Sequence, residues 1–252
     1  MESSKDLSNR FRMIPRQLLC ILLIYLPSQQ IKAQVFEDST FAQRVSKVID
    51  VYYRALGEES PLYNGSEYIE YAFTIQEGHP FFESPVWAPG DIQFEGMTFH
   101  DVPMLYDIIK DLVIIQDFHK QNKINLAADK IQEFTLSGHT FVHVVHDASN
   151  EVRTGFYDRL YNGKIELLAK REKKILEKMA NLQISNVVIG ENIYYVRKNG
   201  VYYLVKNKRT FLDVLKNKKK EVQQYLKKNK IRFKDNFEKA MTVAVTYYDQ
   251  LN

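Results

Sequence analysis

Three histidines stand close together in the segment GHTFVHVVH, at His139, His143 and His146. Imidazole nitrogens are common zinc ligands, so this segment is the first candidate for metal chemistry. The residues around it predict a β-strand on which His139 and His143 share a face and His146 points the other way. Positions four apart on a strand stand about 13 Å apart, too far to share one ion. We therefore predict half-exposed strand histidines, no metal centre and no bound cofactor.

Carboxylates are the second candidate, because two acids that face one cleft can hydrolyse a glycosidic bond. Nearly all of the carboxylates fall at expected turns or strand edges, where solvation is the simpler explanation; they include Asp101, Asp107, Asp111, Asp117 and Asp158. The chain contains no nucleophile elbow, no H-E-x-x-H and neither of the glycine-rich phosphate-binding motifs. We therefore assign no catalytic residue and favour a protein that is not an enzyme.

Aromatic residues crowd two expected hairpins and the segment that ends at Trp87. Sugar-binding and peptide-binding surfaces use such rings because they give a large contact area at a small entropic cost. The candidate aromatic surface consists of Trp87, Tyr157, Tyr161, Tyr195 and Tyr203. The competing explanation is that aromatic residues form strands well and pair across them for about 0.2–1 kcal/mol each. Because tyrosines occur on both faces of each hairpin, one face is expected to be core.

The first 33 residues have the layout of a secretory signal peptide. A basic stretch leads into the apolar run from Leu18 to Leu26, which is shorter than the roughly 20 residues of a transmembrane helix. Pro27 ends the run, and Ala33 supplies the small residue that a signal peptidase requires. We predict cleavage after Ala33 and a mature chain that starts at Gln34.

The only cysteine, Cys20, lies inside the apolar run and lacks the small preceding residues of a lipoprotein signal. The mature protein then has no thiol and no disulfide. An exported domain without cysteines favours the periplasm or cell envelope of a Gram-negative bacterium.

Charge is distributed unevenly along the remaining chain. Residues 34–205 carry 17 basic and 24 acidic side chains, whereas residues 206–252 carry 13 basic and 5 acidic ones. The candidate interaction patch in the basic segment consists of Lys218, Lys219, Lys220, Lys227, Lys228 and Lys230. These lysines either form a solvated face with weak surface ion pairs, or they attach to an anionic surface or an acidic protein. Only the second arrangement gives an association that salt weakens.

The spacing of apolar residues predicts one α+β domain over residues 34–252. An N-terminal helix region covers residues 34–62, with the helix itself running from Phe41 to Leu56. An antiparallel meander of about eight to eleven strands follows over residues 63–206, and a basic αα-hairpin covers residues 207–252. Strands are expected at 91–95, 102–108, 111–116, 123–128, 130–136, 139–146, 156–161, 164–172, 193–198 and 201–206. Asn-Gly pairs at 64–65, 162–163 and 199–200 predict type I′ turns, in which both central residues need φ > 0.

Four segments carry a resemblance to other proteins: SPVWAPGDIQFEGMTFHDVPMLYDIIKD, FYDRLYNGKIELLAKRE, KNGVYYLVKNK and the C-terminal YYDQLN. Together they resemble a group of exported proteins of Bacteroidota that has no assigned activity. The resemblance covers most of residues 60–251 and consists of structural segments. It implies an envelope location, and it transfers no catalytic or binding residue.

The leading hypothesis is an exported envelope protein that binds a protein or an anionic surface. One alternative is a periplasmic hydrolase whose site is assembled only in the fold. Another is a periplasmic carrier of lipid or lipoprotein, which needs a dry cavity. Nucleic acid is not an expected partner of an exported protein, and we expect no transmembrane segment in the mature chain.

Overall fold

The computed structural model describes residues 48, 51–52, 55–146, 152–180 and 183–251. The chain divides into two compact units, residues 1–55 and residues 56–252. The predicted signal peptide, its cleavage site and most of the predicted helix from Phe41 to Leu56 lie outside the described residues. The following account concerns residues 56–252.

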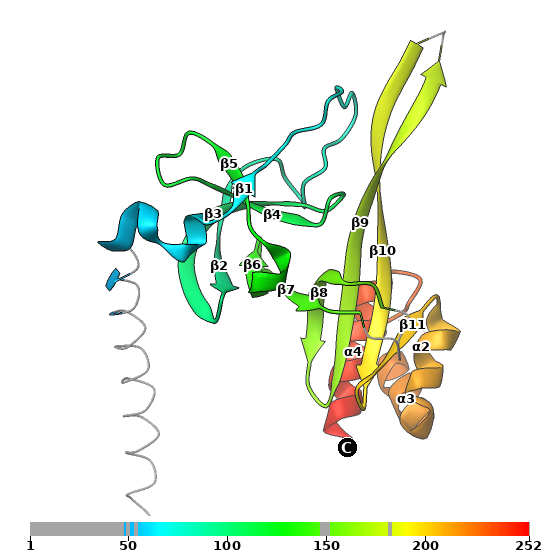
Figure 1. Cartoon of the computed structure of the whole chain (residues 1–252). Helices are drawn as coiled ribbons and strands as arrows, with labels where there is room; N and C mark the ends of the chain where they lie inside the picture. The colour runs from blue at the N-terminus through cyan, green and yellow to red at the C-terminus, as the bar shows by residue number, and fades with distance from the viewer. Residues whose placement is uncertain (1–47, 49–50, 53–54, 147–151, 181–182, 252) are drawn as a thin grey trace, which may run out of the picture. The chain divides into compact units, whose positions relative to one another are not determined.

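An eleven-stranded sheet contains most of the regular secondary structure of the described residues (Figure 1). Its strands are β1 Ser66–Glu67, β2 Ala88–Phe94, β3 Met97–Asp107, β4 Leu112–Gln116, β5 Lys123–Asn125, β6 Ile131–Leu136, β7 His139–Val144, β8 Gly155–Asn162, β9 Ile165–Ala180, β10 Gln183–Lys198 and β11 Val201–Val205. Neighbouring strands all pair antiparallel. The predicted α+β class with an antiparallel sheet is therefore confirmed.

The strand order is β1-β5-β4-β3-β2-β6-β7-β8-β9-β10-β11, which corrects the predicted single meander. Strands β2 to β5 form one meander and β6 to β11 form another, and β2 pairs with β6 to join them. Gly90 permits this pairing, because a Cβ at that position would stand 1.9 Å from the carbonyl oxygen of Thr135. The first strand of a meander leaves one edge unpaired, and β6 covers that edge of β2.

The prediction of a type I′ turn is confirmed at one of the three Asn-Gly pairs. Asn199 and Gly200 have φ values of 52° and 79° and join β10 to β11. Two further hairpins have positive φ at both central residues although neither pair contains asparagine. These pairs are Glu95-Gly96 between β2 and β3 and Ser137-Gly138 between β6 and β7.

The other two turn predictions are wrong, because φ is not positive at Gly65 or at Gly163. Asn64 has a φ of −80° and ends the 3-10 helix η2 Pro61–Tyr63. At the second site the Asp249 carboxylate accepts a hydrogen bond from the Lys164 backbone N–H at 2.6 Å. A side chain from the C-terminal helix thus supports this turn.

Strands β9 and β10 extend well beyond their predicted bounds. They pair continuously from Ile165 opposite Lys198 to Ala180 opposite Gln183, whereas β8 pairs with β9 only as far as Ala169. Among the described residues no named strand borders the outer half of this ribbon, and Glu77 alone forms an isolated parallel bridge with Val187 of β10. Apolar side chains there stay exposed, with Met179 at 74%. The alternation of buried and exposed residues that reveals a strand is weak in such a segment.

Three α-helices close the chain: α2 Lys208–Val214, α3 Lys219–Lys228 and α4 Phe237–Gln250. Short 3-10 helices are η1 Gly57–Glu59, η2, η3 Ala128–Lys130 and η4 Lys216–Lys218. The contact of α3 with α4 gives the predicted αα-hairpin, but η4 divides its first arm into α2 and α3. Asn207 caps α2 by accepting hydrogen bonds from two backbone N–H groups, and Asn236 caps α4 by accepting one from the Lys239 backbone N–H.

The helices cover one face of the strands β8 to β11, with α4 along β8 and β9 (Figure 1). Buried residues on this face include Ile165, Leu167 and Val196, packed against Phe211, Leu215, Met241 and Val245 of the helices. Leu168 points to the opposite face and packs with Tyr157 and Tyr195. Successive residues of β9 point to opposite faces of the sheet, so the strand contributes side chains to two separate cores.

Candidate functional site

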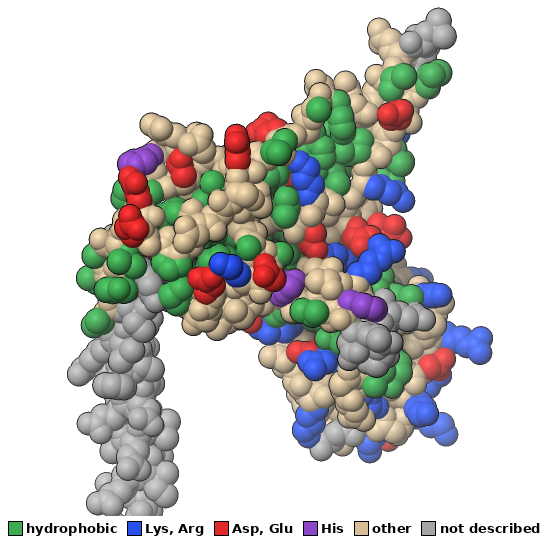
Figure 2. Space-filling model, viewed as in Figure 1, with side chains coloured by type: hydrophobic (Ala, Val, Ile, Leu, Met, Phe, Trp, Pro, Cys, Tyr) green, Lys and Arg blue, Asp and Glu red, His purple; other side chains and the backbone are tan. Residues whose placement is uncertain are grey.

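Lysine and arginine side chains gather over the C-terminal helices (Figure 2). Residues 206–252 contain 13 basic side chains. Among the described residues, three of these have a carboxylate within 4 Å: Lys218 with Glu221, Lys219 with Asp213, and Arg232 with Asp235. The other ten, which have no such partner in the described chain, leave an excess of positive charge on this surface.

The orientation of α4 increases that excess. Its two carboxylates point toward the sheet: Glu238 accepts a hydrogen bond from Arg171 at 2.7 Å, and Asp249 accepts from the Tyr161 hydroxyl at 3.1 Å. Two of the five acids in residues 206–252 are thereby used at the contact between helix and sheet. The outward face of the helices is therefore more basic than the composition of the segment indicates.

The six lysines of the predicted interaction patch fall into two groups. Lys220, Lys227, Lys228 and Lys230 are exposed. Lys218 and Lys219 are partly covered, and their ammonium groups lie 3.9 Å from Glu221 and 2.8 Å from Asp213. The first four are the members that an external anion can reach without breaking an ion pair.

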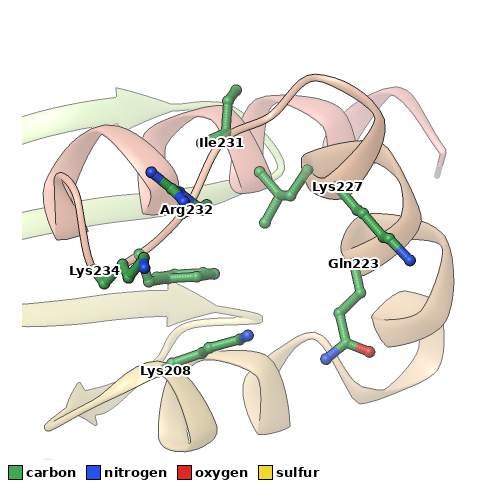
Figure 3. Close-up of a pocket in the computed structure, with 8 residues that line it drawn as sticks. Lys208, Gln223, Lys227, Ile231, Arg232 and Lys234 are labelled. Atoms are coloured by element: carbon green, nitrogen blue, oxygen red, sulfur yellow. The ribbon is translucent and has the colours of Figure 1, made fainter.

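A cleft of about 610 Å³ opens between α2, α3 and the connection from α3 to α4 (Figure 3). It is lined by Lys208, Gln223, Leu226, Lys227, Ile231, Arg232, Phe233 and Lys234. Lys208 of α2 and Gln223 of α3 reach toward one another across the opening in Figure 3. Four of the eight lining residues are cations, three are apolar, and none is a carboxylate.

The apolar floor of the cleft is continuous with the core beneath it. Phe233 lies with its ring centroid 5.7 Å from that of Phe211 and 5.6 Å from that of Phe237. The Lys208 ammonium stands 5.6 Å from the Phe233 ring centroid, within the range of a cation–π interaction. An apolar floor with a positive rim can hold a molecule that has an apolar part and a negative charge.

Lys227 is the one cleft residue that was predicted to carry a function. Lys208, Arg232 and Lys234 were missed, because they belong to segments that are far apart until α3 and α4 fold against each other. The alternation of apolar and basic residues in the run Ile231-Arg232-Phe233-Lys234 is the signal that could have found part of the site.

A second group of charges is buried between the sheet and α4. Asp158 is 1% exposed, and it accepts hydrogen bonds from Arg171 Nε at 2.9 Å. His139 Nδ1 lies 2.7 Å from the same carboxylate, and the Tyr194 hydroxyl donates to Glu238 at 3.0 Å. His139, Arg171 and Glu238 border an open cavity of about 560 Å³.

The electrostatics of this group favour structural ion pairs over acid catalysis. Burial alone would lower the pKa of Arg171, but hydrogen bonds to Glu238 and Asp158 raise it above its usual value. Burial alone would raise the pKa of Glu238, but hydrogen bonding and attraction to Arg171 lower it below its usual value. A glycosidase needs one carboxyl group whose pKa is raised so that it can donate a proton. Glu238 has the opposite tendency.

The prediction that the acids are solvated is wrong for Asp107 and Asp158, which are 0% and 1% exposed. Asp107 accepts a hydrogen bond from the Tyr68 hydroxyl at 2.8 Å. Asp111 is half-buried and accepts from Lys170 Nζ at 2.6 Å. A buried carboxylate requires such partners, and they come from distant segments that local sequence does not reveal.

The predicted aromatic surface is not formed by its five members. Tyr157 and Tyr195 are 1% and 9% exposed, and their ring centroids stand 5.8 Å apart in the core. Trp87 and Tyr161 are half-buried, and Tyr203 is exposed. The explanation by strand pairing and core formation therefore holds for Tyr157 and Tyr195.

The three histidines of β7 and its continuation have separate surroundings. His143 packs beside Phe156, and burial lowers its pKa below the usual value. His146 Nδ1 lies 2.8 Å from the Val152 carbonyl oxygen. In the described part of the chain, no three His, Cys, Asp or Glu side chains are grouped so that they could hold a metal ion.

Within the described residues, no helix combines the length and apolar character needed to cross a membrane. No protein-family model matches the chain, and comparisons with curated proteins and with solved structures found no match.

Proposed function

We propose that this chain is an exported protein of the bacterial envelope and that it works by binding an anionic partner through its C-terminal helices. The observation that carries this proposal is the basic surface on which ten cations have no carboxylate within 4 Å among the described residues. The export part rests on the layout of residues 1–33, outside the described chain.

The placement of the charges supports binding more than simple solubility. Charges that serve solubility alone are usually mixed in sign over the surface. Here the two acidic residues of α4 face the sheet, so that eleven exposed cations of residues 206–252 stand against only three exposed acids among the described residues. A field of one sign attracts anionic surfaces over a distance that salt limits to about 10 Å at 0.1 M.

The experiment compares two charge-matched variants in sedimentation with isolated envelopes at low salt. One variant is Lys220→Gln with Lys228→Gln and Lys230→Gln, and the control is Lys120→Gln with Lys164→Gln and Lys174→Gln. All six side chains are exposed, so both variants lose three charges without disturbing the core. We expect the first variant to lose association and the control to keep it. Equal association of both variants with the wild type would show that the surface is only solvated.

A further inference from the structure

We propose that the cleft between α2, α3 and the α3–α4 connection is a binding site for a single-chain anionic amphiphile. Such a molecule has one acyl or alkyl chain and a phosphate or carboxylate head. This inference rests on the proposed function, because it names the ligand class that part of the basic surface takes.

The apolar part of the ligand is indicated by the floor of the cleft. Leu226 is buried, and Ile231 and Phe233 are half-buried and leave one side open to the cavity. The floor rests on Phe211, which is fully buried in the core beneath the cleft. The volume of about 610 Å³ lies within the range of about 300–1,000 Å³ of small-molecule sites.

The negative head is indicated by the rim. Lys208, Lys227 and Lys234 have no carboxylate within 4 Å among the described residues, whereas Arg232 is held by Asp235 at 2.6 Å. Like charges that converge on one opening repel each other, and an anion between them relieves that repulsion. Gln223 can donate a hydrogen bond to the same head from its side-chain amide.

Isothermal titration calorimetry on the purified chain tests separately whether the alkyl chain and the negative head of the ligand contribute to affinity. The probe is dodecyl phosphate below its micelle concentration, compared with decyl phosphate, inorganic phosphate and dodecyltrimethylammonium. We expect one dodecyl phosphate to bind per chain. Decyl phosphate has two fewer methylene groups to bury, and we expect its affinity to be roughly tenfold weaker. We expect no binding of the cationic amphiphile.

Variants locate the site. Lys208→Gln with Lys234→Gln should weaken dodecyl phosphate binding by about a hundredfold or more, since a hydrogen bond to a charged group is lost at each position. Ile231→Ser should weaken it without any change of charge. The control Lys120→Gln with Lys174→Gln removes the same charge from exposed sites outside the helices and should bind within about twofold of the wild type. Near-ultraviolet circular dichroism checks that each variant is folded.

Any of four results would overturn the inference: no binding of dodecyl phosphate by the wild type, equal affinity for the cationic amphiphile, equal affinity for inorganic phosphate, or wild-type binding by Lys208→Gln with Lys234→Gln. The proposed function is tested separately, because Lys220, Lys228 and Lys230 do not line the cleft. If their variant loses envelope association while dodecyl phosphate does not bind the wild type, the amphiphile site is wrong and the basic binding surface stands.

Discussion

Adjacent residues of β9 anchor the sheet in opposite directions. Lys170 donates to Asp111 at 2.6 Å and to the Phe156 carbonyl oxygen at 3.0 Å. Arg171 points to the other face, where it binds Asp158 and Glu238. Both cations are only 8% exposed, and removal of Arg171 would leave the buried Asp158 carboxylate without its main partner.

Replacement of Arg171 by Met should therefore destabilise the protein strongly. Asp158 would remain buried with its charge uncompensated by Arg171, and we expect a loss of about 3–5 kcal/mol in the free energy of unfolding. The matched control is Arg197→Met on β10, where the ion pair with Glu166 is at 2.8 Å but Arg197 is exposed. That change should cost about 0–1 kcal/mol. Urea unfolding measures both, and equal losses would contradict the structural role of the buried pair.

The lowered pKa of Glu238 makes a prediction about acid stability. Burial opposes ionisation, but hydrogen bonding to Arg171 outweighs it, so the folded state releases the proton more readily than the unfolded state. Such a carboxylate stabilises the fold above its unfolded pKa of about 4.5, and the contribution is lost as the pH falls through the lower folded value. The wild type should exceed Glu238→Gln in unfolding free energy at pH 7, and the difference should shrink below pH 4.5. A difference unchanged at pH 3 would contradict the assignment.

At the scale of elements, the position of a glycine decides what it contributes. Gly200 occupies φ 79° in the β10–β11 turn, with open space where a Cβ would lie. Gly190 lies within β10 without a positive φ, and the nearest atom to a Cβ would be 3.8 Å away. Neither position would crowd a Cβ, so a difference in stability between their alanine variants reports the backbone conformation alone.

Gly200→Ala should cost about 1–2 kcal/mol, because an L-residue is strained in the left-handed region. Gly190→Ala should raise the free energy of unfolding by about 0.5–1 kcal/mol, because alanine loses less conformational entropy than glycine on folding. Thermal unfolding of the two variants checks the turn. An unchanged melting temperature for Gly200→Ala would show that the turn assignment is wrong.

Much of the element pattern could be predicted from local sequence, and the long-range contacts could not. The period of two in segments such as β11, the pair Asn199-Gly200 and the apolar stripes of the helices are local signals. The pairing of β2 with β6 depends on the close approach at Gly90, which local sequence does not show. The partners of Arg171 are 13 and 67 residues away, so the local spacing of residues could not predict the buried ion pairs.

Export and binding depend on different parts of the chain, export on residues 1–33 and binding on the basic residues 206–252. Residues 1–33 predict a signal peptide, and cleavage after Ala33 should leave Gln34 at the N-terminus. Mass spectrometry of the protein isolated from its native envelope should find that terminus. Recovery of the full-length chain from the cytoplasm would contradict the proposed location and would leave the basic surface to be explained differently.

The uneven charge distribution determines which partners the proposed binding surface attracts. Residues 34–205 are net acidic and residues 206–252 are net basic. Attraction through the basic segment must therefore be selective for negative partners and must weaken as ions screen it. An apolar attachment would behave in the opposite manner, since salts that are excluded from protein surfaces strengthen burial.

The most direct test is a salt titration of the wild type bound to isolated envelopes. The screening length is about 10 Å at 0.1 M salt and about 3 Å at 1 M salt. We predict progressive release over this range, and release of the variant Lys220→Gln, Lys228→Gln, Lys230→Gln at lower salt than the wild type. Full retention of the wild type at 1 M salt would contradict binding through the basic surface.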